Sequence, residues 1–164
     1  MCAFCHGGSI APKTPSFSYL PGETLADYFF IPSANQGITS GAVVTAGIDV
    51  HGNQVGLMEM SRCFRSSTTM TCSTCHDVHV PQRNLAAFSE RCLTCHQIDR
   101  CLVYPKAGRQ IAGKCVDCHM PNQESSKIVV NASDGKNVRP RVRNHRIKVY
   151  PEESQAVLKQ LQVP

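Results

Sequence analysis

One short pattern, Cys-x-x-Cys-His, occurs four times in this chain of 164 residues and constrains its fold more than any other feature. The first copy opens the chain, and the other three lie between Thr71 and His119. Together they take up eight of the ten cysteines and four of the seven histidines, so most of the thiol chemistry belongs to one repeated signal. The copies are Cys2-Ala-Phe-Cys5-His6, Cys72-Ser-Thr-Cys75-His76, Cys92-Leu-Thr-Cys95-His96 and Cys115-Val-Asp-Cys118-His119.

This pattern is typical of covalent haem attachment. Two thiols three residues apart can each form a thioether with a haem vinyl group, and the next residue then lies beneath the iron, where imidazole is a good axial ligand. Paired cysteines also build zinc sites and redox dithiols, but neither explains a histidine after every pair. With 7 His in 164 residues, chance supplies one at each position with a probability of about 4%. The sequence predicts four haems c, and a zinc-clustered binding module is the alternative if no haem is present.

The length of the chain allows about forty residues per haem, which is too little protein to enclose four macrocycles in a conventional core. The chain also contains 10 Pro and 11 Gly and lacks Trp, as expected of a chain rich in loops. We therefore expect a single tetrahaem cytochrome domain over residues 1–164. Its predicted fold is mostly irregular, with short α-helices wrapped around a stacked four-haem core.

The formal charge of +5 taken alone suggests a nucleic-acid partner, but the charges of the predicted haems offset it. Each ferric haem with two propionates adds about −1, so the total becomes about +1 when oxidised and about −3 when reduced. The basic run around His145 is expected to pair with propionates or to form a solvated face. We predict no nucleic-acid partner. No run of twenty apolar residues occurs, so we also predict no membrane span.

The cellular compartment follows from the predicted cofactor. Haem c is attached outside the cytoplasmic membrane, so the protein is expected to be exported to the periplasm or the extracellular space. Met1 lies directly before the first motif, with no signal peptide, and we expect a mature form or an excised part of a longer chain.

Local signals predict several short elements. Asn84 is a candidate N-cap for a helix that delivers the third motif, and Pro151 with two acidic residues is typical of a helix start. Short helices should also contain the second and fourth motifs. Further expectations are a one-turn helix or haem-packing segment at 22–30, a loop or hairpin at 33–50, a helix at 53–65, a strand at 128–130 with a turn at 134–135, and a C-terminal helix at 151–162 used for packing or subunit contact.

Counting axial ligands leaves one position unfilled. Four bis-histidine haems need eight imidazoles, and the chain has seven. The motif histidines His6, His76, His96 and His119 are the proximal candidates, and His51, His79 and His145 are the distal ones.

His79 is too close in sequence to His76 to reach the opposite face of the same haem, so it should ligate a neighbouring one. The eighth position is filled by a methionine, is open, or is filled from another chain or from an absent N-terminal segment. The methionine candidates are Met58, Met60 and Met70; Met120 adjoins a proximal histidine and is less suitable.

Cys63 and Cys101 remain outside the motifs. Both flank haem motifs in an oxidising compartment, and a loop-rich chain gains stability from a cross-link. We predict a Cys63–Cys101 disulfide, with two free buried thiols as the alternative.

Several stretches of the chain resemble multihaem cytochromes c with doubled motifs, related to the tetrahaem cytochromes of nitrifying bacteria. The resemblance spans about residues 2–147. It implies that His51, His79 and His145 are distal ligands and that Cys63 and Cys101 act as a pair. Some chains of this type are similar to subunits of extracellular cytochrome filaments. The stretches are Pro21-Gly-Glu-Thr-Leu-Ala-Asp-Tyr-Phe29, Ser61-Arg-Cys63-Phe64, Met70-Thr-Cys-Ser-Thr-Cys-His-Asp-Val-His79, Cys115-Val-Asp-Cys-His-Met-Pro121 and Asn144-His145-Arg-Ile147.

The function expected from these features is electron transfer through four closely packed haems, without a substrate. Such a carrier, which is not an enzyme, exchanges electrons with other redox proteins or with copies of itself in a homo-oligomer or filament. The alternative is a multihaem oxidoreductase that acts on a small nitrogen or sulfur compound at the under-ligated haem.

Overall fold

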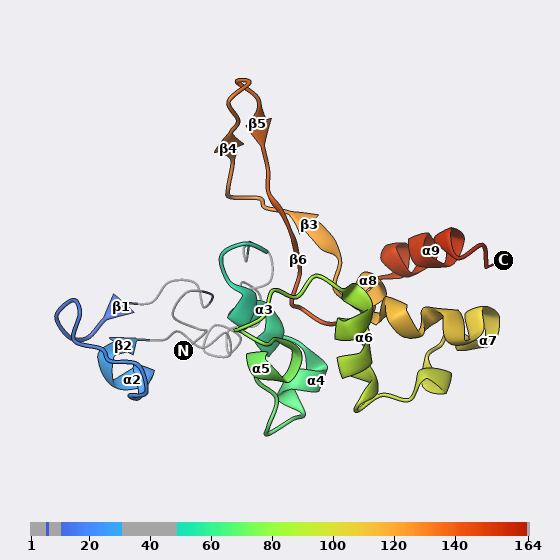
Figure 1. Cartoon of the computed structure of the whole chain (residues 1–164), viewed down its shortest axis with the longest axis horizontal. Coiled ribbons are helices and arrows are strands. Elements are labelled where there is room, and N and C mark those ends of the chain that lie inside the picture. The colour runs from blue at the N-terminus through green and yellow to red at the C-terminus, as the bar shows by residue number, and fades with distance from the viewer. Residues whose placement is uncertain (1–5, 7–10, 31–48, 164) are drawn as a thin grey trace, which may run out of the picture.

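The computed structural model describes His6, residues 11–30 and residues 49–163 (Figure 1). The attachment cysteines Cys2 and Cys5 lie outside these residues, as does most of the loop or hairpin expected at 33–50.

The N-terminal described segment folds back on itself as a small antiparallel unit. Strand β1 (Ala11–Pro12) pairs with β2 (Phe29–Phe30). Helix α2 (Leu25–Tyr28) is a single turn, because Phe29 already has extended backbone angles. The ring of Tyr19 meets those of Tyr28 and Phe29 edge-on, with centroids 5.6 and 6.3 Å apart. Of the two alternatives for this segment, the short helix is therefore present, as one turn, and packing on a haem remains a prediction.

The helix expected at 53–65 is split into α3 (Gln54–Glu59) and α4 (Arg62–Arg65). The Asn53 side chain caps α3 by accepting from the Gly56 amide at 2.9 Å. Gly56 permits this close approach, since a Cβ there would lie 2.7 Å from the Asn53 amide. The two helices are separate because Ser61 takes an extended conformation, which turns the chain between them.

The three described motifs all lie on or next to short helices, as predicted. Helix α5 (Cys72–Cys75) contains the second motif, and α8 (Cys115–His119) contains the fourth. Helix α6 (Leu85–Leu93) delivers the third. Its expected N-cap is confirmed, because the Asn84 side chain accepts from the Ala86 amide at 3.0 Å.

A packed hydrophobic cluster joins the C-terminal helix to the segment before the fourth motif. That segment consists of the 3-10 turn η2 (Ile98–Arg100), α7 (Tyr104–Ala107) and the 3-10 turn η3 (Gly108–Lys114). Ala107 and Ile111 pack there against Leu158 of α9 (Pro151–Gln160). Pro151 begins α9, as predicted, and packing is the observed role of this helix.

Two short ribbons complete the described structure (Figure 1). Strand β3 (Asn122–Glu124) pairs with β6 (Arg141–Arg143), and β4 (Val130–Asn131) pairs with β5 (Asn137–Val138) in a projecting hairpin. The predicted turn is confirmed by Gly135, whose φ of 78° favours glycine. No helix in the described ranges has the length and apolar character needed to cross a membrane.

Candidate haem-binding site

Each described motif places its cysteines and histidine on one turn of backbone. The amide of His76 donates to the carbonyl of Cys72 at 2.9 Å, and the amide of His96 donates to that of Cys92 at 3.0 Å. In the fourth motif, the whole pentapeptide is helical. This turn brings two thiols to one edge with the histidine next to them, which is the order that thioether attachment and axial ligation require.

The structure brings together His76 of the second motif and His145, which lies 69 residues further along the chain. Their ring centroids are 5.9 Å apart, and the ring planes differ by 24°. Two imidazoles bound to opposite sides of one metal, at about 2 Å per bond, have centroids about 6 Å apart. The separation of these two stacked rings is close to that distance.

The His145 ring is prepared for ligation by its surroundings. Its Nδ1 lies 3.1 Å from the carbonyl oxygen of Arg143, and because a carbonyl can only accept, Nδ1 must be the protonated nitrogen. Burial lowers the pKa of His145, as do the nearby rings of His76 and His6, although the carbonyl acts in the opposite direction. The ring is therefore neutral at pH 7, and its Nε2 lone pair is available to a metal.

His119 has the same arrangement in the fourth motif. Its Nδ1 lies 2.8 Å from the carbonyl oxygen of Lys148, so this ring too donates from Nδ1 and keeps Nε2 as an acceptor. A backbone carbonyl on the far nitrogen is a usual orienting partner of a metal-bound histidine.

Three other predicted ligands are not paired within the described parts of the chain. The side chains of His51, His79 and His96 are exposed, and no ring contact involves them there. The amide of His79 donates to Asp77 at 3.0 Å, which fixes its backbone but not its ring. Their assignment as axial ligands remains a prediction.

Asp49 fixes the backbone just before His51. Its carboxylate accepts from the His51 amide at 3.1 Å, the Ser125 hydroxyl at 2.7 Å, and the amide of Ser126 at 2.6 Å. Burial alone would raise the pKa of Asp49, but these hydrogen bonds together outweigh it and hold the pKa at about 2. Asp49 is thus ionised across the physiological pH range, and sequence reasoning did not identify it.

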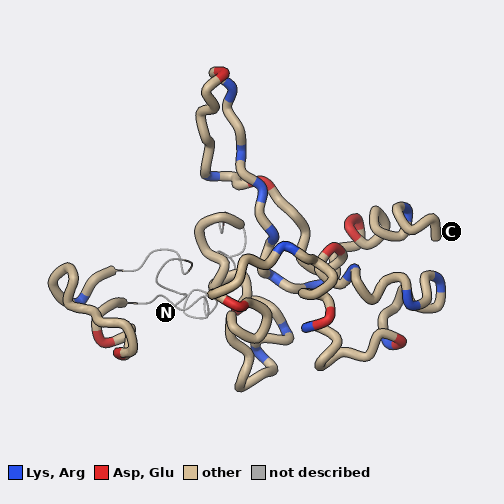
Figure 2. Tube along the Cα trace, viewed as in Figure 1, with Lys and Arg blue, Asp and Glu red and all other residues tan. Residues whose placement is uncertain are grey.

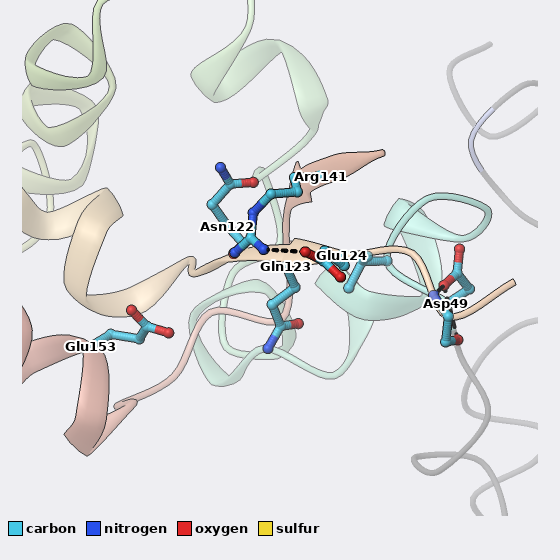
Figure 3. A pocket seen from close by; sticks show the side chains of 8 residues that line it. Asp49, Asn122, Gln123, Glu124, Arg141 and Glu153 are labelled. Atoms are coloured by element: carbon cyan, nitrogen blue, oxygen red, sulfur yellow. Dashed lines mark hydrogen bonds and ion pairs between the residues drawn. The ribbon is translucent and has the colours of Figure 1, made fainter. Parts of the chain in front are cut away.

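The groove beside Asp49 has a volume of about 600 Å³ but does not fit a haem (Figure 3). It is lined mostly by polar side chains, and the Arg141–Glu124 ion pair, 2.8 Å long, lies in the middle of it. Among the described residues, no motif cysteine or histidine lines this groove.

The predicted Cys63–Cys101 disulfide is not formed. Both cysteines are free, and they lie in different groups of thiols. Cys63 on α4 is close enough to Cys75 to raise the pKa of that thiol, an effect secondary to burial. Cys101, at the end of η2, acts in the same way on Cys118. The prediction was wrong because the two helical regions place these cysteines next to different motifs.

A thiol pair that the sequence did not predict joins the third and fourth motifs. Cys92 and Cys115 lie close enough to shift each other's pKa: interaction with Cys92 lowers the pKa of Cys115 to about 7, and interaction with Cys115 raises that of Cys92. Helix α6 is also linked to α8 through Ser89, whose hydroxyl accepts from the amide of Val116 at 3.4 Å. The attachment points of these two motifs are therefore adjacent.

Figure 2 marks the positions of Lys and Arg along the chain, and three arginines of the basic run around His145 have partners within the protein. The guanidinium of Arg143 donates to Asp117 at 2.6 Å, that of Arg141 pairs with Glu124, and that of Arg139 donates to the carbonyl of Ser125 at 3.1 Å. Arg139 and Arg141 are nevertheless exposed, so the expected solvated face is present in part, and pairing with propionates remains a prediction. A sequence reveals cations but not the acceptors that folding places beside them.

Within the described ranges, no group of three or more His, Cys, Asp or Glu side chains is arranged to hold a metal ion directly. Comparison of the chain with protein-family models, curated proteins and solved structures gives no match.

Proposed function

We propose that this protein is a multihaem cytochrome c that transfers electrons through four covalently attached haems. The observation on which this rests most directly is the spacing of His76 and His145, two rings 5.9 Å apart that come from distant parts of the chain. His76 belongs to a Cys-x-x-Cys-His motif. The ring of His145 is neutral and protonated at Nδ1, which leaves Nε2 free to bind a metal. The repeated motif and the position of His145 beside the histidine of one copy support the proposal separately.

The residues have distinct roles in this proposal. The cysteine pairs attach the macrocycles, with Cys2 and Cys5 serving the first. The motif histidines are proximal ligands, and His51, His79 and His145 are distal ligands, with the eighth position still to be assigned. Carbonyls of Arg143 and Lys148 hold the Nδ1 protons of His145 and His119, so that both rings keep their orientation.

When bound, haem iron supplies one-electron chemistry between its ferric and ferrous states. The chain contributes the distances and the surroundings. Cys92 and Cys115 are near each other, and Ser89 links their helices, so the attachment points of the third and fourth motifs are adjacent, as electron transfer between neighbouring groups requires. The packed cluster around Ala107, Ile111 and Leu158 is small, in keeping with a chain in which cofactors provide much of the core.

This role implies export, because haem c is attached outside the cytoplasmic membrane. The protein then works in the periplasm or outside the cell, and exchanges electrons with other redox proteins or with copies of itself in an oligomer or filament.

The proposal is tested by producing the chain in a bacterial host that matures cytochromes c. The purified protein should have the mass of the polypeptide plus four haems and the sharp reduced bands of haem c. Replacing both cysteines of one motif by alanine should remove one haem equivalent. A chain of unmodified mass without these bands would refute the proposal, and a high-spin band that shifts with carbon monoxide or nitrite would support the oxidoreductase alternative.

A further inference from the structure

Ser61 occupies a helix N-cap position but does not cap its helix. It precedes α4, where a serine side chain usually accepts from the amides of the first turn, yet it makes no such bond. Its side chain is 0% exposed. A hydroxyl buried to this extent is expected to have partners, and those of Ser61 lie far away in the sequence.

Both partners belong to the short segment that begins at the distal ligand candidate, His145. The Ser61 hydroxyl donates to the carbonyl of His145 at 3.0 Å and accepts from the amide of Ile147 at 2.8 Å. One side chain thus satisfies two backbone groups on either side of Arg146. The backbone that leaves His145 is held to the corner between α3 and α4.

Gln54 of α3 holds the same segment from its other end. Its Nε2 donates to the carbonyl of Arg143 at 3.2 Å, the same oxygen that accepts from Nδ1 of His145. The other amide atom, Oε1, is buried and has no hydrogen-bond partner among the described residues. An unpartnered buried acceptor is destabilising, so Gln54 is poorly explained by stability alone.

We propose that the corner between α3 and α4, through Ser61 and Gln54, positions the His145 ring for ligation opposite His76. This inference rests on the proposed function. Ser61 and Gln54 are positioning residues, since neither touches the iron. Groups that orient a metal ligand in this way typically change metal affinity by about 10- to 100-fold when they are removed.

Competition with carbon monoxide measures this effect in the haem-loaded, reduced protein. Carbon monoxide replaces His145 on ferrous iron, and no electron is transferred. In Ser61→Ala and Gln54→Leu, the carbon monoxide concentration that converts half of this haem to its carbon monoxide complex should be about 10- to 100-fold lower than in the wild type. His145→Ala provides the reference spectrum of that haem without its distal ligand.

Ser125→Ala is the matched control, because Ser125 is also buried, at 1% exposed, and its hydroxyl makes hydrogen bonds away from the His145 segment, to Asp49 at 2.7 Å and from the amide of Ile128 at 2.8 Å. It should lower the thermal unfolding midpoint but leave the carbon monoxide curve unchanged. Ser61→Thr, which keeps the hydroxyl, should restore the wild-type curve. If Ser61→Ala does not fold, Gln54→Leu decides. This variant removes the hydrogen bond to the Arg143 carbonyl and keeps the two hydrogen bonds of the buried Ser61 hydroxyl.

The outcomes separate this inference from the function on which it rests. An unchanged carbon monoxide curve in a folded Ser61→Ala or in Gln54→Leu, with haem bands intact, overturns the positioning role alone. Haem bands with no spectral change in His145→Ala overturn the His76–His145 pairing and the inference with it. A protein without haem c bands overturns the proposed function.

Discussion

The Arg143 side chain makes three hydrogen bonds to the fourth motif and the residue after it, and removing it provides a test of that packing. Its guanidinium donates to the Asp117 carboxylate at 2.6 Å and to the carbonyls of Met120 and Val116 at 3.0 and 3.3 Å. The side chains of Arg143 and Asp117 are 27% and 20% exposed, so water screens their attraction only in part.

The cost of Arg143→Met follows from this geometry. An exposed ion pair contributes at most about 1 kcal/mol, whereas breaking a fully buried one costs about 3–5 kcal/mol. A partly buried pair with two further bonds at a helix C-terminus lies between these limits. We expect Arg143→Met to lower the free energy of unfolding by about 2–3 kcal/mol.

Urea denaturation followed by far-UV circular dichroism measures this loss. A double-mutant cycle with Asp117→Asn should give a coupling energy of at least about 1 kcal/mol. Arg143→Lys should recover little of the lost free energy of unfolding, since an ammonium group cannot replace the planar set of donors on the guanidinium. The matched control is Arg141→Gln, because the Arg141–Glu124 pair is 53% and 54% exposed and should cost less than about 1 kcal/mol. Equal losses at both arginines, or a coupling energy near zero, would refute the reasoning.

Three further predictions concern a carboxylate and the thiols. The pKa of Asp49 is lowered from 3.8 to about 2, so the stabilisation that its ionised carboxylate gives the fold is present above pH 3.8 and is lost as pH falls through 2. Asp49→Asn should lower the free energy of unfolding by about 1 kcal/mol at pH 7 and should flatten the acid-unfolding curve between pH 3.8 and 2. Because Cys63 and Cys101 are free, thiol titration of the denatured haem-loaded protein should find two thiols, and a count of zero would mean that they are cross-linked. In the haem-free chain, Cys115 should be alkylated at pH 7 faster than Cys92, because its pKa is lowered to about 7 while that of Cys92 is raised. Mass spectrometry of partly modified protein measures the two rates, and equal rates would contradict these shifts.

Features decided by a few neighbouring residues could be predicted from the sequence. The cap at Asn84 and the helix start at Pro151 depend only on local chemistry, and both are present. Motif helices follow from the same local rule. The helix at 53–65 was only partly predicted, because the break at Ser61 depends on partners more than eighty residues away, the His145 carbonyl and the Ile147 amide.

Predictions that needed tertiary contacts were less successful. Cys63 and Cys101 were paired because they were the cysteines left over, but proximity between distant residues is set by packing, and they lie apart. Arg143 was expected to meet a propionate or water, yet Asp117, within the fourth motif itself, is its partner. His145 was a distal candidate by counting and by the family resemblance, and neither of these pairs it with His76.

These corrections indicate that the segment from Arg143 to Lys148 links two motifs. Arg143 is bonded to Asp117, and the Lys148 carbonyl holds Nδ1 of His119, so both ends of the segment contact the fourth motif. Between them, His145 faces His76 of the second motif. His145 and Lys148 are three residues apart, and an extended chain advances about 3.3 Å per residue, so their backbones lie within about 10 Å. The positions of these two proposed haem ligands are therefore coupled through one short stretch of chain, and a shift of this segment would move His145 together with the group that orients His119.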